Sequence, residues 1–120
     1  AVEFNLIHQE LSPIVLDAYN SRDIEAFSAL FSDDAQVLQF PDNKVLAQGK
    51  ANVKELYKKL FDASPNLYSE LINRTVLGNR VIDHEKITGR AGVDVLELAV
   101  VYEVDQGKIS KCMVIRQKQD

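Results

Sequence analysis

The second half of the chain decides the fold, and its residues 67–88 read LYSELINRTVLGNRVIDHEKIT. This stretch alternates in polarity, is rich in β-branched residues and is interrupted once, at Gly78-Asn79. Such a pattern predicts two strands joined by a tight turn. Connections this short cannot cross over a sheet, so consecutive strands are expected to pair antiparallel. The pattern continues toward the C-terminus and predicts four strands in all, at 67–77, 80–88, 93–104 and 109–117.

Apolar residues at helical spacing mark the start of the chain. One helix is expected to end at Asn20 and to begin at about residue 3 or residue 12. Asp23 can cap a second, short helix, which the polar sequence at 32–34 ends. The buried stripe of this second helix is expected to consist of Ile24, Phe27, Leu30 and Phe31.

A hairpin and a third helix complete the first half. Residues 35–40 and 44–47 are expected to form two short strands around the turn sequence Pro41-Asp42-Asn43. A helix follows over 51–63, with charged residues on one side. The apolar residues on its other side are Val53, Leu56, Tyr57, Leu60 and Phe61. Helices followed by long strands predict the α+β fold class.

Length and composition are those of one globular domain, residues 1–120, with 46% apolar and 27% charged residues. The net charge of −4 and the pI near 5.2 argue against a nucleic-acid partner, because phosphate binding needs clustered Lys and Arg. No apolar run approaches the roughly 20 residues that span a bilayer, so a membrane partner is not expected.

The single cysteine, Cys112, excludes an intrachain disulfide. The first ten residues include Glu3 and His8 and lack the basic start and uninterrupted apolar core of a signal peptide. A reducing compartment suits such a chain, and we therefore expect a cytoplasmic protein.

The order of elements and several local sequences resemble one superfamily. Residues 19–23 read YNSRD and lead through further apolar residues into the first strand, Gly49 precedes the third helix, and Gly107-Lys108 lies in the last hairpin. The residues that continue the first of these motifs are Phe27, Leu30, Phe31, Asp34 and Ala35. In these features the chain resembles the nuclear transport factor 2-like superfamily, including its SnoaL-like (polyketide-cyclase) and ketosteroid-isomerase-like branches.

The resemblance covers essentially the whole chain. It implies three N-terminal helices packed on a curved, mixed, mainly antiparallel sheet around a cone-shaped apolar pocket, as in a cystatin-like α+β roll. It also implies that the outer face of the sheet pairs with a second subunit and that no metal or organic cofactor is bound. The matching motifs concern packing and turns, so they identify a fold and not a reaction.

The ketosteroid-isomerase branch uses a tyrosine, a carboxylate base and a protonated aspartate. Alignment through the shared motifs places Val15, Gln39 or Phe40, and Ala99 at these positions. Valine and alanine have no proton to give, and glutamine is not a base near neutral pH. Classical ketosteroid isomerisation is therefore not expected, and any activity needs a different set of residues.

The strand at 80–88 provides two candidate catalytic carboxylates, Asp83 and Glu85. Alternate residues of a strand point to the same face, so both share a face with Val81 and Ile87. The resemblance implies that this face is concave, which leaves His84 outside. Two neighbouring buried carboxylates would raise one pKa and so create a general acid or base. The structural alternative is a solvated or ion-paired pair at the edge of the sheet.

Glu97 is a charge within an apolar run, and it shares strand parity with Ala99. Burying a charge alone is costly, so Glu97 is expected to pair with Arg116 or Arg74, or to contact substrate. On the last strand, the alignment places Cys112 and Arg116 inward. We interpret Cys112 as a small apolar side chain and not a nucleophile, and Arg116 as a group that could bind a carboxylate ligand.

Four further residues complete the substrate-binding candidates. The hydroxyls of Tyr19 and Tyr57 could reach the pocket, although core packing with a satisfied hydroxyl is the simpler interpretation. Gln39 is included because it aligns with the isomerase base. Asn73 is a polar residue in the middle of a predicted strand.

Three functions remain open. The first is a cofactor-free isomerase, cyclase or dehydratase that uses Asp83 or Glu85 on a small apolar or carboxylate-bearing molecule. The second is a non-catalytic ligand-binding domain, and the third is a protein-interaction module. A metal site is not expected, because His8 and His84 have no His or Cys neighbours at ligand spacing.

A homodimer is expected through the outer face of the sheet. The argument is that an apolar stripe of opposite parity to the assigned pocket face would be a liability on a monomer. This stripe consists of Leu96, Leu98, Val100 and Tyr102.

Overall fold

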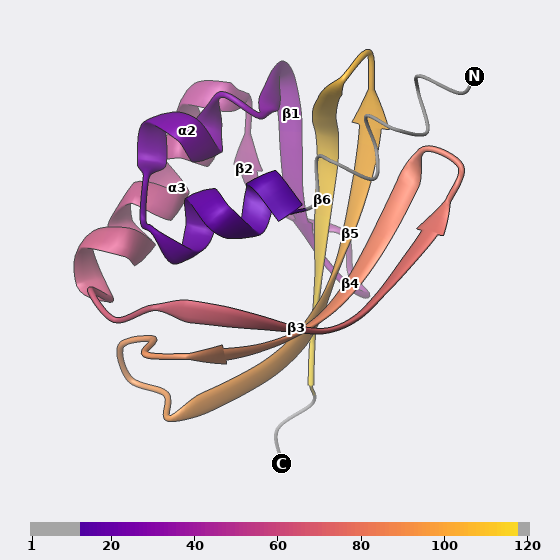
Figure 1. Ribbon diagram of the computed structural model, residues 1–120. Coiled ribbons are helices and arrows are strands. Elements are labelled where there is room, and N and C mark those ends of the chain that lie inside the picture. The colour runs from indigo at the N-terminus through magenta and orange to yellow at the C-terminus, as the bar shows by residue number, and fades with distance from the viewer. Residues whose placement is uncertain (1–12, 118–120) are drawn as a thin grey trace.

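The computed structural model describes residues 13–117. In this part of the chain, helices pack on one face of a six-stranded sheet (Figure 1). The first helix covers 13–20, and two more follow as α2 (Ile24–Ser28) and α3 (Lys50–Ala63). The strands are β1 (Phe31–Gln39), β2 (Lys44–Gln48), β3 (Tyr68–Leu77), β4 (Arg80–Thr88), β5 (Val95–Asp105) and β6 (Lys108–Arg116).

The strand order is β2-β1-β6-β5-β4-β3. β1 pairs parallel with β6, and every other neighbouring pair is antiparallel. The last four strands therefore form the predicted antiparallel meander, and the mixed, mainly antiparallel α+β fold is confirmed. Figure 1 shows the sheet curving around the helices, which leaves one concave face and one convex face.

The second helix ends earlier than the sequence predicted. Asp23 caps α2 as expected, since its Oδ1 accepts a hydrogen bond from the Ala26 N–H at 3.1 Å. However, β1 begins at Phe31 and not at residue 35. The Leu30 carbonyl accepts a hydrogen bond from the Ile109 N–H at 2.8 Å, so pairing with the last strand replaces a further helical turn. The predicted start of the first helix, at residue 3 or 12, lies outside the described residues.

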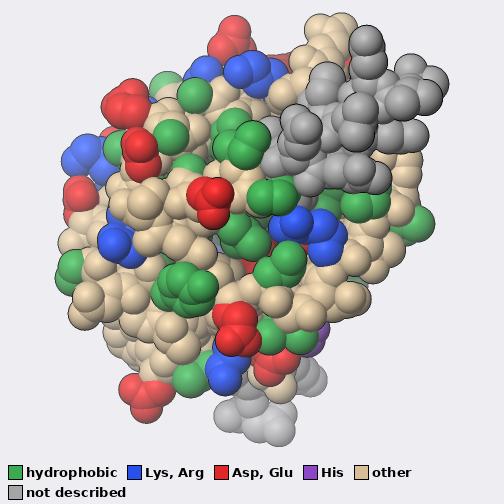
Figure 2. Space-filling view, viewed as in Figure 1, with side chains coloured by type: hydrophobic (Ala, Val, Ile, Leu, Met, Phe, Trp, Pro, Cys, Tyr) green, Lys and Arg blue, Asp and Glu red, His purple; other side chains and the backbone are tan. Residues whose placement is uncertain are grey.

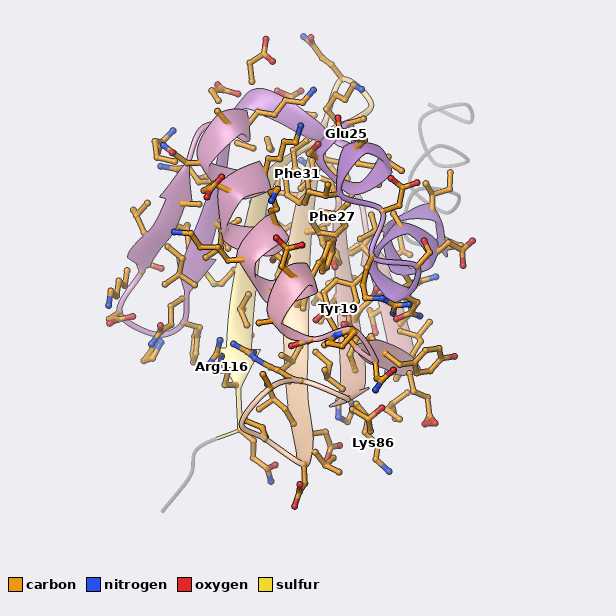
Figure 3. All side chains as sticks on the ribbon, turned by 90° about the vertical axis from the view of Figure 1, so that its left-hand side faces the viewer. Tyr19, Glu25, Phe27, Phe31, Lys86 and Arg116 are labelled. Carbon is orange, nitrogen blue, oxygen red and sulfur yellow. The ribbon has the colours of Figure 1, made fainter. Side chains whose placement is uncertain are left out.

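The predicted apolar side of the third helix is confirmed. Val53 and Phe61 on α3 are buried, and Leu56, Tyr57 and Leu60 pack against the same core. Five aromatic rings form a cluster between the helices and the sheet, with ring centroids 4.6 to 6.5 Å apart. These rings belong to Tyr19, Phe27, Phe31, Tyr57 and Phe61. Figure 3 shows the labelled rings between the helices and the strands.

The corner between the first two helices is fixed to the edge strand. The Asn20 side chain accepts a hydrogen bond from the Ser69 N–H at 2.7 Å and donates one to the Ser69 carbonyl at 3.1 Å. Arg22, at a φ of 53°, donates to the carbonyls of Asn20 and Leu67 at 2.7 and 2.8 Å. The motif at residues 19–23 therefore anchors the helices on β3.

The predicted faces of β5 were wrong. Leu96, Leu98, Val100 and Tyr102 are all buried on the concave face, whereas Glu97 is exposed on the convex one. The pairing of β4 with β5 shows which residues face inward. Glu85 on β4 lies opposite Leu98 on β5, and residues directly opposite one another share a face of the sheet. The apolar stripe that suggested a homodimer is thus part of the core, and the argument for a homodimer through it fails.

The face of the molecule seen in Figure 2 shows no basic patch. In the view of Figure 2, Lys and Arg side chains are interspersed with Asp and Glu. None of the helices described is long and apolar enough to cross a membrane.

Candidate functional site

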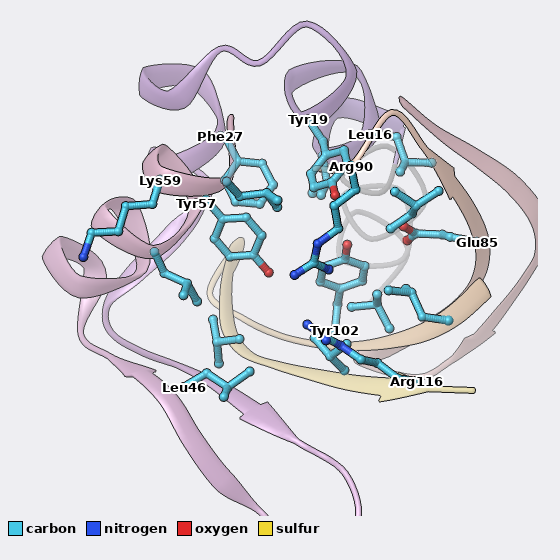
Figure 4. Close-up of a pocket in the computed structure, with 18 residues that line it drawn as sticks. Leu16, Tyr19, Phe27, Leu46, Tyr57, Lys59, Glu85, Arg90, Tyr102 and Arg116 are labelled. Carbon is cyan, nitrogen blue, oxygen red and sulfur yellow. The ribbon is translucent and has the colours of Figure 1, made fainter. Parts of the chain in front are cut away.

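A cavity of about 330 Å³ lies between the helices and the concave face of the sheet (Figure 4). Most of its wall is apolar, as is usual for a small-molecule site. The apolar residues that line it are Val15, Leu16, Phe27, Val37, Leu46, Leu56, Leu60, Ile87, Leu98, Val100 and Val114. The polar and charged ones are Tyr19, Tyr57, Lys59, Glu85, Arg90, Tyr102 and Arg116.

Glu85 is the one carboxylate in the cavity wall among the described residues. Its side chain is almost fully buried, with 4% of the residue exposed. The Ser69 hydroxyl donates a hydrogen bond to Oε1 at 2.8 Å. In contrast, Oε2 is buried without a hydrogen-bond partner among residues 13–117. Burial raises the pKa of Glu85 to about 7, and the charge of Asp83 adds to the increase, whereas the Ser69 hydrogen bond opposes it.

Asp83, the other candidate catalytic carboxylate, has a different environment. It is fully buried on the same face of β4, and Arg74 donates hydrogen bonds to both of its oxygens, at 2.8 and 3.0 Å. Both carboxylate oxygens are therefore occupied, and the residue does not line the cavity. The structure thus separates the two predicted carboxylates: one faces the cavity and the other forms an internal ion pair.

Three tyrosines contribute hydroxyl groups to the cavity. Tyr19 and Tyr57 lie where the sequence predicted, on the helices, and Tyr102 comes from β5. Their hydroxyls point toward a common space that the Glu85 carboxylate also faces (Figure 4). Burial raises the pKa of each hydroxyl above its ordinary value, and the Glu85 charge adds to this in all three. The hydroxyls are therefore neutral hydrogen-bond donors near neutral pH.

Two other predicted residues of the last strand face inward. Cys112 is buried, its Sγ lies 4.0 Å from the Tyr57 hydroxyl, and burial raises the pKa of the thiol to about 12. The thiol is therefore protonated and supports the wall without lining the cavity. Arg116 lines the open end of the cavity.

Three predicted site residues do not reach the cavity. Glu97 lies on the convex face and pairs with His84 Nε2 at 2.7 Å, so the expected pairing with Arg116 or Arg74 is wrong. Asn73 is exposed on β3, and Gln39 ends β1 outside the cavity lining.

Not every position that aligns with a ketosteroid isomerase residue lies at the cavity. Val15 does line the cavity, but Ala99 is on the convex face, opposite His84. The residues on either side of it, Leu98 and Val100, face the cavity and are also apolar. The conclusion that no acidic donor stands there is therefore unchanged.

Sequence reasoning missed three polar residues of the cavity wall, Lys59, Arg90 and Tyr102. Tyr102 was assigned to the outer face with Leu96, Leu98 and Val100, although its cross-strand partner Val81 has the parity of Glu85. Arg90 lies in a loop, where strand periodicity gives no direction for a side chain. No cluster of three or more metal-ligating side chains occurs among residues 13–117.

Comparison with solved structures gives a consistent fold. The chain is similar to an uncharacterized cystatin-fold protein from Novosphingobium aromaticivorans, with 22% identity and a TM-score of 0.84 over 91% of this chain and 97% of that one. It is also similar to a candidate ketosteroid isomerase from Kribbella flavida, with 18% identity and a TM-score of 0.82 over 95% and 80%.

A third structure is a protein with a ketosteroid isomerase-like fold from Catenulispora acidiphila, in complex with trimethylamine. It has 13% identity and a TM-score of 0.75 over 88% of this chain and 83% of that one. Identities this low establish the fold alone.

Family-level comparison goes further than the structures do. No curated protein matches the sequence significantly. The SnoaL-like domain matches residues 15–112, from the first cavity residue of the first helix to the middle of β6. The resemblance to the nuclear transport factor 2-like superfamily is confirmed, and within it this chain belongs to the SnoaL-like domain family.

Proposed function

We propose that this protein is a cofactor-free enzyme that moves a proton on a small molecule, as an isomerase, cyclase or dehydratase does, with Glu85 as the acid–base group. One observation carries the proposal: a buried carboxylate in the cavity wall has one oxygen fixed by Ser69 and the other without a partner. A buried polar atom of this kind is costly unless a ligand uses it.

The acidity of Glu85 suits this role. A general base works best when its pKa is near the pH at which it operates, and the pKa of Glu85 is about 7. At neutral pH both protonation states are populated, so the group can take up a proton and return it. Of the two carboxylates that the sequence left open, the contacts favour Glu85, because both oxygens of Asp83 are held by Arg74.

The tyrosines supply the second requirement of such a reaction. Proton removal next to a carbonyl places negative charge on its oxygen, and neutral hydroxyl donors in an apolar site stabilise that charge. Tyr19, Tyr57 and Tyr102 face the same space as Glu85 (Figure 4). Tyr19 shares the first helix with the isomerase-aligned Val15, and Tyr102 shares β5 with Ala99, so the donors stand at other positions than those that the ketosteroid isomerases use.

The relatives support this class of function without identifying the substrate. One structural neighbour is a candidate ketosteroid isomerase, another a candidate polyketide cyclase, and a third holds trimethylamine, a small molecule. The second function left open by the sequence, ligand binding without turnover, uses the same cavity and is separated from catalysis by the following test.

The test uses 5-nitrobenzisoxazole, a neutral chromogenic compound whose ring opens when a carboxylate removes one C–H proton. We expect turnover above buffer that rises with pH through about 7 and falls about a hundredfold or more in Glu85→Gln. Glu97→Gln, which removes an exposed carboxylate from the convex face, is the matched control and should keep full turnover. Equal turnover in Glu85→Gln and the unmodified protein would contradict the proposal.

A further inference from the structure

The loop between β4 and β5 places an arginine at the open end of the cavity. Gly89, with a φ of +74°, precedes Arg90, and a Cβ at Gly89 would lie 2.1 Å from the Asn66 carbonyl oxygen. This close approach, together with a 3.0 Å hydrogen bond from the Ala91 N–H to the buried Ser64 hydroxyl, fixes the loop against the end of α3. The backbone at Arg90, and with it the direction in which the side chain leaves the loop, is therefore fixed.

A second arginine reaches the same region from the sheet. Arg116 is the last residue of β6 and lies opposite Leu98 of β5, on the concave face. Figure 4 shows the Arg90 guanidinium extending into the cavity and the Arg116 side chain below it, whereas the ammonium of Lys59 points away. Figure 3 shows Arg116 at the far end of its strand, beyond the aromatic cluster. Two guanidinium groups thus stand at one end of one cavity.

Neither arginine has an anionic partner within residues 13–117. The ion pairs there join other residues: Lys54 with Glu25, Lys58 with Asp62, Arg74 with Asp83, Arg80 with Glu103, and His84 with Glu97. Partial burial, and then the charge of Arg90, lower the pKa of Arg116. Arg90 is half-buried and Arg116 is exposed, and their like charges repel one another, so a bound anion would relieve that repulsion.

We propose that Arg90 and Arg116 together bind the carboxylate of a small apolar acid whose body occupies the cavity. Arginine presents a planar fork that matches the two oxygens of a carboxylate. Leu98 lies between Arg116 and Glu85 on the concave face, and Val100 and Ile87 also line the cavity, which suits a hydrocarbon body. A phosphate or phosphonate dianion is the alternative anion for two guanidinium groups, and the titration below compares the two.

This inference rests on the proposed function in one respect only, namely that both assign a ligand to the same cavity. An acid held at the arginines would direct its opposite end toward the space shared by Glu85 and the tyrosines (Figure 4). Binding of the carboxylate needs no proton transfer, so the two proposals can fail separately.

Calorimetric titration of the unmodified protein at pH 8 with straight-chain acids, from butyrate to decanoate, tests the inference. Each acid is compared with its primary amide and with the alkyl phosphonate of equal chain length. We expect at least one acid to bind at least about tenfold more tightly than both, because hydrogen bonds to a charged group are worth more than neutral ones. Equal binding of acid and amide, tighter binding of the phosphonate, or saturable binding by none of the acids would overturn the inference.

Three arginine variants locate the anion site. Arg90→Gln and Arg116→Gln should each lower the affinity for the acid about tenfold or more and leave the affinity for the amide unchanged. Arg80→Gln is the matched control, since Arg80 is exposed and pairs with Glu103 away from the cavity. Undiminished acid affinity in both Arg90→Gln and Arg116→Gln would overturn the assignment.

Glu85→Gln distinguishes the two proposals. This variant should bind the acids at least as tightly as the unmodified protein, because it removes a negative charge from the cavity. Retained acid binding together with unchanged turnover of 5-nitrobenzisoxazole in Glu85→Gln would reject the acid–base function and leave the anion site standing. Loss of acid binding in this variant, with its fold intact by circular dichroism, would contradict an anion site formed by the arginines.

Discussion

Two neighbouring inward positions of β4 hold carboxylates, Asp83 and Glu85, that differ in the number of their hydrogen-bond partners. Asp83 is 0% exposed and Glu85 is 4% exposed, so burial does not distinguish them. Arg74 contacts both oxygens of Asp83, whereas Ser69 contacts one oxygen of Glu85 and leaves the other toward the cavity. Partner count, and not burial, separates a structural carboxylate from one that is available for chemistry.

The difference in partners also bears on the acidity of Glu85. Burial penalises the charged form of a carboxylate, and only a neighbouring cation or several hydrogen bonds would offset that penalty. Glu85 has only a neutral hydroxyl donor, so its pKa rises to about 7. Variants of Asp83, Glu85, Ser69 and Glu97 test whether the number of partners determines the role of each carboxylate.

The largest effect is expected at the internal ion pair. Asp83→Asn leaves the Arg74 guanidinium, whose side chain is 19% exposed, without its anionic partner. We expect the free energy of unfolding to fall by about 3 kcal/mol, measured by urea denaturation at pH 7. The double variant Asp83→Leu with Arg74→Met should recover most of the loss. A loss below about 1 kcal/mol in Asp83→Asn would mean that the pair is not structural.

Removing Glu85 should change how stability depends on pH. The folded pKa of about 7 lies above the ordinary value of 4.5, so folding favours the protonated form. The free energy of unfolding of the unmodified protein should therefore fall as pH rises from about 4.5 to above 7, by on the order of 3 kcal/mol.

Glu85→Gln lacks this contribution. Relative to the unmodified protein, it should gain stability by a similar amount between pH 4.5 and pH 8, measured by urea denaturation at both values. Because other titrating groups are common to both proteins, their effects cancel in the comparison. Parallel stability profiles for the two proteins would show that the acidity of Glu85 is ordinary.

A smaller effect is expected from the hydroxyl that fixes Glu85. The Ser69 hydrogen bond favours the charged carboxylate and so lowers its pKa. Ser69→Ala should raise the pKa of Glu85 further and move the pH dependence of 5-nitrobenzisoxazole turnover upward, with a cost of about 1 kcal/mol in stability. A shift of that profile to lower pH would contradict the assigned hydrogen bond.

The smallest effect is expected on the convex face. His84 and Glu97 form an ion pair there with both side chains almost half exposed, at 44% and 46%. Such surface pairs contribute little, so Glu97→Gln should change the free energy of unfolding by less than about 0.5 kcal/mol. A loss as large as that of Asp83→Asn would show that partner count alone does not rank these carboxylates.

The sequence predicted the fold well because the fold depends on local patterns. Alternation along residues 80–88 put Asp83 and Glu85 on one face, which the family resemblance implied to be the concave one, and helical spacing placed Tyr57 toward the core. Both patterns combine polar and apolar residues clearly enough to select a face.

The same reasoning failed on β5 for a physical reason. Residues 95–104 are apolar at almost every position, so alternation selects no face, and an alignment through Ala99 selected the wrong one. The two glutamates of the strand, Glu97 and Glu103, share the parity that the structure places on the convex face. They were the available signal, and using it would have brought Tyr102 into the cavity.

The polar half of the site depends on contacts that periodicity does not encode. Arg90 is directed by the approach of Gly89 to Asn66, which joins two loops far apart in sequence. The unequal partners of Asp83 and Glu85 depend on the register of β3: Arg74 lies opposite Asp83, whereas Ser69 lies opposite Ile87 and reaches Glu85 diagonally. These contacts are set by the tertiary structure, so the sequence could identify both carboxylates as candidates but could not show which one is free to act on a ligand.

The most direct test of this account is a carbon-13 NMR titration of the side-chain carboxyls in protein with labelled glutamate. Glu85→Gln assigns the Glu85 signal by its loss from the spectrum. The account predicts that this signal titrates with a pKa of about 7, well above the roughly 4.3 of a glutamate in a model peptide. A Glu85 signal that titrates near the model-peptide value would contradict the account, because the cavity would then hold an ordinary ionised carboxylate.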